Sequence, residues 1–247
     1  MELYPYASIS KKALPTPCLT TNKVYYLRTL LDLDYLDNFG IHNLGNNKTY
    51  TYMWDESIAS RDSSEVASCL LKFIKQLPPS TKSIIAFSDS CGGQNKNKNT
   101  LKLWMYIVNN TNIETVDHKF LEPGHTYMEC DEDFGLIEKH KRHIQYVFVP
   151  NEWTKAVQET SKWFYVQEMT SKDFFSFSDL DGISPNLKKD KEKQNVAWRT
   201  VKWLRLEKCN LYSMKFKNTL TESFEFLEAD WSLKSKGRPS MQKLKLL

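Results

Sequence analysis

Two polar clusters in the sequence contain the side chains that could do chemistry. The first is FSDSCGGQNKNKN (Phe87–Asn99), in which Asp89 comes directly after a short apolar run. Gly92 and Gly93 let the backbone approach a phosphate or a metal ion, and amides at the start of a helix favour an anion. The stretch therefore indicates a carboxylate that holds a divalent metal ion beside a phosphodiester. A capped Asp–Ser turn without a function gives the same pattern.

The second cluster is GHTYMECDEDFGLIE, whose histidine and acids are His125, Glu129, Asp131, Glu132, Asp133 and Glu138. Acids ahead of a helix often only stabilise its N-terminus. Mg²⁺, however, prefers carboxylate oxygens, and carboxylates from different strands can hold the metal ions of phosphoryl transfer. We expect Asp89 and Asp131 to hold Mg²⁺ or Mn²⁺ in an active protein, with His125 as a phosphate contact or a proton carrier.

Zinc is an alternative metal, because Cys91, Cys130 and His125 could supply its ligands. Their spacing matches no standard zinc motif. The five cysteines are scattered and no pair has CxxC spacing, which favours reduced thiols over a disulfide framework. Magnesium is therefore the stronger interpretation.

The elements that must position these clusters follow one another as strand, strand, helix, strand, helix, strand and helix. The signals that separate them are period-two alternation, a capped apolar stripe and a continuous apolar run. The expected ranges are Val24–Leu36, Lys48–Ser60, Asp62–Pro79, Ser83–Ser88, Asn99–Asn110, Ile113–Leu121 and, after a loop, the end of Pro123–His143. A helix is the alternative for the second half of Val24–Leu36. Lys11–Lys23 is rich in Pro and Thr and is expected to be a loop. This order indicates an α/β (α+β) fold with a mixed sheet flanked by helices.

The character of the sequence divides the chain into four stretches. We expect an N-terminal loop or remnant strand at 1–23 and the sheet-forming core at 24–146. Short aromatic-rich segments predict a smaller, strand-rich C-terminal α+β region at 147–233, followed by a basic tail at 234–247. All the candidate site residues fall within the core.

Composition limits the kind of protein more than its function. The 247 residues are 40% hydrophobic and 13% aromatic, which is enough for a packed core. No apolar run approaches the roughly 20 residues that span a bilayer, and no secretory signal is visible. We therefore expect a nuclear or cytoplasmic protein that is not secreted and has no membrane partner. The net charge of +4 is compatible with binding nucleic acid.

The motifs LPTP…YYLR…NFGIH, SDSCGGQNKN and FLEPGHTYMECDEDFGLIEKH resemble those of a large family found in animal genomes. Members of that family look transposon-derived, with an RNase H-like core of the DDE transposase or integrase kind. The resemblance covers most of the chain, from Ala13 to Trp203. It implies an RNase H-like, five-stranded mixed sheet, a plan that the order of the expected elements also favours.

The resemblance also implies roles for individual residues. Asp89 matches the second acid of the catalytic set. His125 and Asp131 match a Gly-His-Thr-x4-Asp pattern that supplies the third acid, and Asp133 and Glu138 are nearby alternates.

The first acid of that family comes from a strand just before the LPTP segment, in a pattern like Phe-Asp-Leu-Glu. Here the stretch is YASISKKALPTP, and Ile9 stands where the acid is expected. We therefore expect the first strand to be degenerate or truncated. Metal-dependent phosphoryl transfer depends on charge placement, so a missing ligand costs orders of magnitude in rate. The expected function is that of a transposase-derived domain related to phosphodiester cleavage and strand transfer on DNA, catalytically impaired as it stands.

The alternative is a domesticated module that binds nucleic acid or another protein without catalysis, and then no cofactor is expected. DNA is the expected partner, with RNA as an alternative, and electrostatic binding of this kind weakens steeply with salt. The basic residues expected to line the nucleic-acid track are Lys96, Lys98, Lys139, Lys141 and Arg142.

Overall fold

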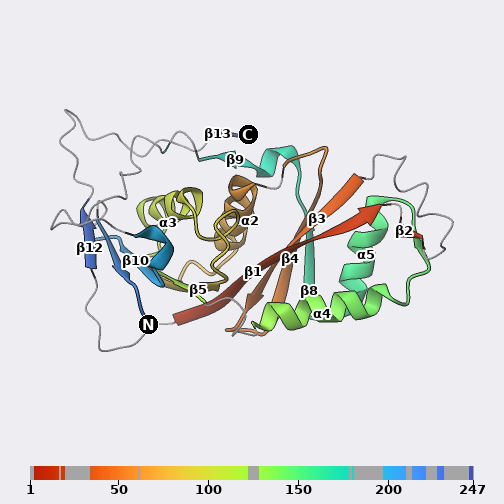
Figure 1. Ribbon diagram of the computed structural model, residues 1–247, viewed down its shortest axis with the longest axis horizontal. Helices are drawn as coiled ribbons and strands as arrows, with labels where there is room; N and C mark the ends of the chain where they lie inside the picture. The colour runs from red at the N-terminus through yellow and green to blue at the C-terminus, as the bar shows by residue number, and fades with distance from the viewer. Residues whose placement is uncertain are drawn as a thin grey trace.

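A long, twisted β-sheet runs through the middle of the computed structural model, with helices on both of its faces (Figure 1). The structure describes residues 3–16, 18–19, 34–60, 62–121, 128–177, 180, 197–209, 213–220, 227–230 and 245–246. The elements and contacts given for the protein belong to these ranges.

Nine strands in the described ranges form the main sheet. In spatial order they are β12 (Leu227–Asp230), β11 (Ser213–Lys217), β10 (Trp203–Glu207), β6 (Thr115–Phe120), β5 (Ser83–Ser88), β1 (Leu3–Thr16), β3 (Asp34–Asn43), β4 (Lys48–Asp55) and β8 (Phe164–Glu168). Two short pairs lie outside it, namely β2 (Cys18–Leu19) with β7 (Tyr146–Val147), and β9 (Phe175–Ser176) with β13 (Lys245–Leu246).

The centre of the sheet combines antiparallel and parallel pairings. β1 is antiparallel to β3, and β3 is antiparallel to β4. On its other side β1 is parallel to β5, and β5 is parallel to β6. The C-terminal ends of β1, β5 and β6 therefore point to the same end of the sheet, which is where open α/β sheets place their ligands.

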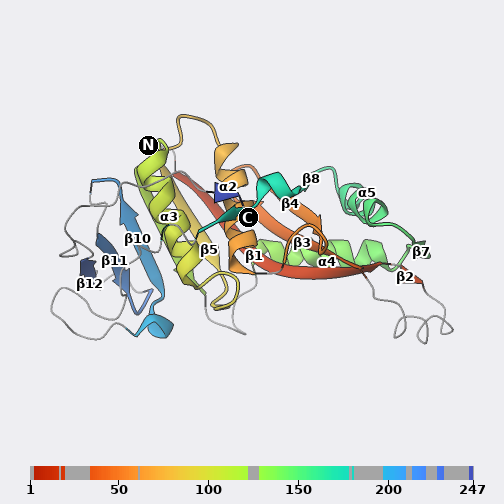
Figure 2. The ribbon, with the colours of Figure 1, turned by 90° about the horizontal axis from the view of Figure 1, so that it is seen from above.

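Four α-helices cover the two faces, and none in the described part of the chain is long and apolar enough to cross a membrane. α2 and α3 lie side by side on one face, whereas α4 and α5 pack on the other (Figures 1 and 2). Each face has its own hydrophobic core, with Trp104 in the first and Trp153 in the second. Their bounds, with two short 3-10 turns, are α2 (Ser63–Lys75), α3 (Lys98–Asn110), α4 (Glu129–Lys141), α5 (Pro150–Thr160), η1 (Ser171–Asp173) and η3 (Trp198–Thr200).

The mixed α+β class expected from the sequence is confirmed, and so are most elements between residues 48 and 143. β5 matches the expected strand at both ends. β4, α2, α3, β6 and α4 fall within the expected ranges or differ by a residue at one end. These segments have regular apolar periodicity and clear ends, the two signals on which the expectation depended.

The N-terminal part differs from the expectation. β1 is a strand of 14 residues, and its C-terminal end falls in the predicted Pro- and Thr-rich loop. The expected strand Val24–Leu36 lies mostly outside the described residues, and the antiparallel partner of β4 is β3. β3 reads DYLDNFGIHN, and Asp, Asn and Gly are depleted in strands. Burial of Phe39 and Ile41, together with pairing to β1 and β4 on both sides, overrides that preference.

The main sheet has nine strands rather than five, because segments after residue 147 add strands to both sides. β8 pairs parallel with β4 at one edge, and β10 pairs antiparallel with β6 towards the other. α5 was not expected, although Pro150 in its first turn and Glu152 nearby are ordinary helix-start signals. The division into four stretches stays a prediction, and the basic tail falls almost wholly outside the described ranges.

Candidate functional site

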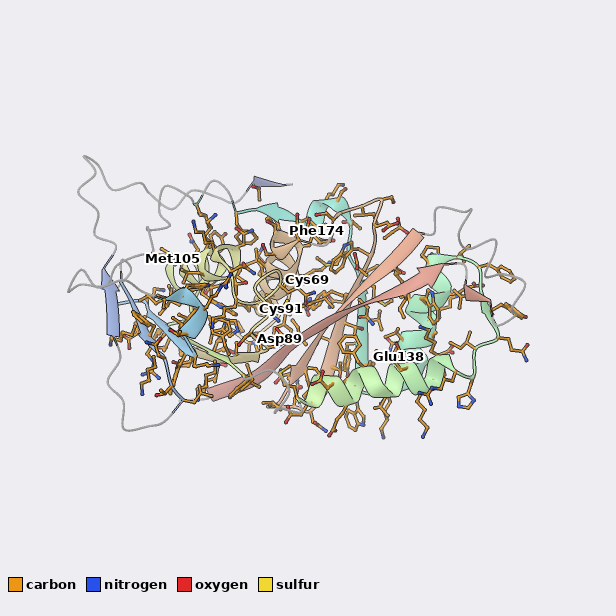
Figure 3. The ribbon with its side chains drawn as sticks, viewed as in Figure 1. Cys69, Asp89, Cys91, Met105, Glu138 and Phe174 are labelled. Atoms are coloured by element: carbon orange, nitrogen blue, oxygen red, sulfur yellow. The ribbon has the colours of Figure 1, made fainter. Side chains whose placement is uncertain are left out.

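Asp89 lies at the C-terminal end of β5, half-buried, near the middle of the molecule (Figure 3). Its Oδ1 accepts hydrogen bonds from the Cys91 backbone N–H at 3.0 Å and from Asn95 Nδ2 at 2.8 Å. Asp89 is the first residue after β5 and comes two residues beyond Phe87, which packs against the core of α4 and α5. The carboxylate is thus fixed through one oxygen at the end of the sheet where ligands bind.

A directed chain of hydrogen bonds supports the Asp89 backbone from the other face of the sheet. Trp104 Nε1 lies 3.1 Å from His118 Nδ1, and an indole N–H can only donate. His118 therefore carries its proton on Nε2 and donates to Ser88 Oγ at 2.8 Å. Ser88 Oγ in turn donates to the Asp89 carbonyl oxygen at 2.9 Å. Burial, assisted by the Lys96 charge, lowers the pKa of His118 to about 3 and so keeps the ring neutral.

The turn after Asp89 leads into the N-terminus of α3. The Cys91 carbonyl oxygen accepts the Asn95 N–H at 2.9 Å, and the Asn97 side chain caps α3 by accepting a backbone N–H at 3.0 Å. Asn95 Oδ1 is buried and has no hydrogen-bond partner in the described part of the chain. This oxygen belongs to the side chain that holds Asp89, and it is available to a cation or a water molecule.

β1 brings no carboxylate beside Asp89. The last parallel pair between β1 and β5 joins Ala7 with Phe87, and Ile9 and Asp89 each lie two residues beyond that pair. The whole of β1, LYPYASISKKALPT, contains no Asp or Glu. The strand next to Asp89 is therefore present, but its acid is not.

α4 places its acids on two different flanks. Asp131 is exposed and its Oδ2 accepts the Met128 N–H at 3.2 Å, which caps the helix. Asp133 is buried and faces β3 and β4. At about 100° per residue, Asp131 and Glu138 lie roughly half a turn round the helix from Asp133. They share the flank that faces away from β4, towards β1 and β5, and Figure 3 shows Glu138 further along α4 from Asp89.

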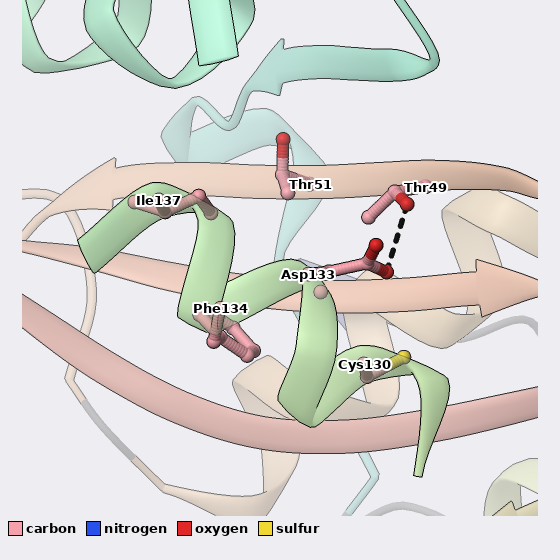
Figure 4. Close-up of a pocket in the computed structure, with 7 residues that line it drawn as sticks. Thr49, Thr51, Cys130, Asp133, Phe134 and Ile137 are labelled. Carbon is pink, nitrogen blue, oxygen red and sulfur yellow. Dashed lines mark hydrogen bonds between the residues drawn. The ribbon is translucent and has the colours of Figure 1, made fainter. Parts of the chain in front are cut away.

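Asp133 belongs to a buried polar cluster between α4 and the β3–β4 hairpin (Figure 4). Its Oδ2 lies 2.8 Å from His42 Nδ1 and accepts the Thr49 hydroxyl at 2.8 Å. His42 Nε2 lies 3.0 Å from Asn47 Oδ1, so both ring nitrogens face acceptors and both donate. The hydrogen bond to Asp133 raises the pKa of His42. Asp133 is therefore engaged in an internal ion pair.

The same cluster borders an open pocket of about 200 Å³ on the β4 side of α4. Glu129, Glu132 and Trp163 contribute to its lining, together with His42 and Asn47. Asn47 adopts a left-handed backbone conformation with φ of 54°, and this turn geometry brings its amide to the histidine. The pocket lies on the flank of α4 opposite to Asp131 and Glu138.

The expected basic residues divide into one buried and four partly or fully exposed side chains. Lys96 is buried, and its Nζ donates to the Arg199 carbonyl oxygen at 2.7 Å. Burial lowers its pKa to about 8, so this lysine braces the turn and does not face an open track. The others lie on the surfaces of α3 and α4 and at the end of α4, and they are Lys98, Lys139, Lys141 and Arg142.

His125 lies outside the described residues, so its relation to Asp89 and Asp131 stays a prediction. Within the described ranges, no three His, Cys, Asp or Glu side chains form a group that could hold a metal ion. Cys130 is buried, with its Sγ accepting the His42 N–H at 3.1 Å, whereas Cys91 is exposed. These two thiols give the zinc alternative no support.

Sequence reasoning missed the residues whose hydrogen bonds support the Asp89 backbone. Ser88 lies on β5 and His118 on the neighbouring strand β6, and Trp104 of α3 donates a hydrogen bond to His118. The available signal was a polar Ser at the end of an apolar run and a His at a core-facing position of the next strand. A partner for either could be assigned only once the strands were placed side by side.

The fold and the site together define a mixed α+β protein with a carboxylate-bearing turn at the end of its central parallel strands. Residues 38–219 match the family model described as "Domain of unknown function (DUF7869)", and the chain belongs to that family. The match begins within β3 and leaves β1 outside it. No curated protein and no solved structure matches the chain.

Proposed function

We propose that the chain is a transposase-derived RNase H-like domain, related to proteins that cleave and join phosphodiester bonds with metal ions. The observation that carries this proposal is the strand order β4-β3-β1-β5-β6, with Asp89 at the C-terminal end of β5. Antiparallel pairs on one side of β1 and parallel pairs on the other support the RNase H-like plan of two antiparallel strands that feed a β-α-β run.

Asp89 and Asp131 are the residues proposed to hold Mg²⁺ or Mn²⁺. Support comes from the flank of α4 that carries Asp131 and Glu138, because it turns towards β1 and β5. Asn95 Oδ1 adds a buried oxygen with no partner in the described part of the chain. When bound, the ion would supply positive charge to the phosphate undergoing transfer. Asp133 suits this role less well, because His42 and Thr49 already occupy its carboxylate.

The missing acid in β1 sets the expected level of activity. With no acid in β1, the set of carboxylates that would hold two metal ions is incomplete, so cleavage would be strongly impaired. The same observation favours the second candidate, a domesticated module that binds nucleic acid without catalysis. Either function fits the nuclear or cytoplasmic location expected from the sequence.

A plasmid-nicking assay with Mg²⁺ or Mn²⁺ separates the two candidates, and Asp89→Asn is its control. An impaired enzyme gives slow nicking that requires metal and disappears in Asp89→Asn. A binding module retains DNA at low salt and nicks nothing at any metal concentration. Absence of both nicking and nucleic-acid retention would contradict both candidates.

A further inference from the structure

One face of the sheet carries aromatic and basic side chains in rows that cross four strands. The first row joins Phe87 of β5, Lys119 of β6, Trp203 of β10 and Lys217 of β11. The next row contains Asp117, Arg205 and Lys215. We call these seven residues the Trp203 face.

The ring of Trp203 organises the cations of the first row. Its Nε1 donates to Asp117 Oδ1 at 2.6 Å, which fixes the ring in the sheet face. Lys119 Nζ lies 4.2 Å and Lys217 Nζ 4.9 Å from the ring centroid. Lys119 Nζ also lies 5.4 Å from the centroid of Phe87. Cation–π attraction therefore keeps these ammonium groups beside aromatic surface.

Positive charge exceeds negative charge on this face. The Asp117 carboxylate accepts two hydrogen bonds from Arg205, one from Nε at 2.8 Å and one from a terminal nitrogen at 2.9 Å. Glu207, in the row beyond, lies 2.7 Å from Lys215 Nζ. Lys119 brings a further, partly exposed positive charge to the face, whereas Lys217 is buried. The side chains of Arg205 and Lys215 are each 30% exposed, so the second row is open to a ligand.

The Trp203 face is partly exposed and lies next to Asp89, since five of its residues are partly exposed and only Asp117 and Lys217 are buried. On this side of the sheet α4 packs on β1 and β3, and α5 packs on β8, in the right-hand half of Figure 1. Among the described elements, no α-helix covers β10 and β11 on this side, and Figure 3 shows side chains projecting below these strands. Asp89 follows the end of β5, two residues beyond Phe87, and Phe87 is paired with Lys119 of β6.

We propose that the Trp203 face binds single-stranded nucleic acid. Half-buried rings of Phe87 and Trp203 offer π-faces to unpaired bases, and the surrounding cations offer charge to the phosphates. This combination favours a single strand over a duplex, whose bases are stacked inside and unavailable to aromatic side chains. The inference rests on the proposed function in one respect, because a strand bound to the Trp203 face would extend towards Asp89.

Fluorescence anisotropy tests the proposal with a labelled single strand of about 16 nucleotides and the matching duplex. EDTA keeps metal ions out of the measurement. Lys119→Gln is expected to reduce the slope of log affinity against log salt by about 0.7, the change for one lost phosphate contact with a single strand. Trp203→Leu is expected to weaken single-strand binding by about tenfold with little change in the salt slope.

Lys162→Gln is the matched control, because Lys162 Nζ lies 5.0 Å over the exposed Trp163 ring elsewhere on the protein. This variant removes the same charge and the same kind of contact, and it should bind as the wild type does. Trp203→Phe keeps a ring and should bind within a few-fold of the wild type, even where Trp203→Leu fails to fold.

The proposal is overturned if Lys162→Gln weakens binding as much as Lys119→Gln does. Tighter binding of the duplex than of the single strand, or no binding of either at low salt, would also overturn it. Mn²⁺ calorimetry on the same protein variants in buffer without EDTA examines the Asp89 site separately. Metal binding without single-strand binding would contradict only the proposal for the Trp203 face. Single-strand binding without metal binding would contradict only the proposed metal site at Asp89.

Discussion

His118 Nε2 donates a hydrogen bond of 2.8 Å to Ser88 Oγ, directly beneath the turn that carries Asp89. Ser88 Oγ donates a hydrogen bond to the Asp89 carbonyl oxygen at 2.9 Å, while Trp104 Nε1 donates to the opposite side of the imidazole. All donors and acceptors of this chain point one way only if the imidazole is neutral. The position of the Asp89 turn therefore depends on the protonation state of a buried histidine on the neighbouring strand.

Stability is expected to fall in mild acid because of His118. Its folded-state pKa of about 3 lies below the ordinary value of 6.5, so between these values the unfolded chain binds the proton and the folded chain does not. His118 should therefore reduce the free energy of unfolding by about 1.4 kcal/mol for each pH unit below 6.5. Urea unfolding from pH 7 down to pH 4 measures this slope.

His118→Gln is the matching variant, because its amide can donate to Ser88, can accept from Trp104, and does not titrate. The difference in unfolding free energy between wild type and variant should shrink or reverse as the pH falls, since only the wild type loses stability there. A difference that stays constant from pH 7 to pH 4 would contradict the assigned neutral imidazole.

His42 is expected to behave in the opposite direction. The hydrogen bond to Asp133, opposed by burial and assisted by Asn47 and the Glu129 charge, raises its pKa above 6.5. Its contribution to stability is therefore complete at low pH and is lost as the pH rises through the folded-state pKa. NMR titration of the ring proton should give a pKa above the ordinary value, and Asp133→Asn should lower it. A His42 pKa unchanged by Asp133→Asn would contradict the ion pair.

The two neighbouring acids of α4 should differ sharply in their effect on stability. Asp133→Asn leaves His42 buried without its counter-charge and should cost about 3 kcal/mol of unfolding free energy. Asp131→Asn changes an exposed capping carboxylate and should cost about 0.5–1 kcal/mol. Urea unfolding of both variants at pH 6 measures the difference. Equal losses of unfolding free energy in the two variants would contradict the different environments of Asp131 and Asp133.

A close approach between β3 and α4 should make Gly40 intolerant of a side chain. A Cβ built on Gly40 would lie 3.3 Å from the ring of Phe134, which is itself buried. Gly40→Ala should destabilise the protein by about 1–2 kcal/mol, because the ring must shift within a packed core. In a Phe134→Leu background the same change should cost less, since the ring is gone. Thermal unfolding of the four proteins gives the coupling, and strict additivity would contradict this contact.

The sequence predicted those elements whose physical signals are local. Ser83–Ser88 is a continuous apolar run and α2 an apolar stripe with a clear stop, so neighbouring residues alone indicate both. β3 could not be predicted in this way, because DYLDNFGIHN is stabilised by strands and a helix that are distant in sequence. His42, for example, meets Asp133 across 91 residues.

The candidate site was predictable in part for the same reason. Glycines and polar residues within one short stretch of the sequence indicate the turn at Asp89. The burial of Lys96 could not be inferred locally, because its partner Arg199 lies 103 residues away. The different flanks of Asp131 and Asp133 follow from helix geometry, but which flank faces Asp89 depends on how α4 packs on β1 and β3.

An acid restored to β1 should create metal affinity. Ile9 and Asp89 each lie two residues beyond Ala7 and Phe87, the last pair of β1 and β5, so Ile9→Asp would place a second carboxylate on the strand adjacent to β5. Two carboxylates and further oxygens are the donor set that Mg²⁺ and Mn²⁺ prefer. We expect Ile9→Asp to bind Mn²⁺ at least about tenfold more tightly than the wild type, as measured by calorimetry.

The gain must depend on Asp89 and on the position of the new acid. Ile9→Asp combined with Asp89→Asn should lose the added affinity, because the single remaining carboxylate cannot share the ion. Ser8→Asp and Ser10→Asp add the same charge one residue away along β1 and serve as matched controls. If these controls bind Mn²⁺ as tightly as Ile9→Asp does, the increase is an effect of net charge. The register of β1 against β5 would then not define a metal site.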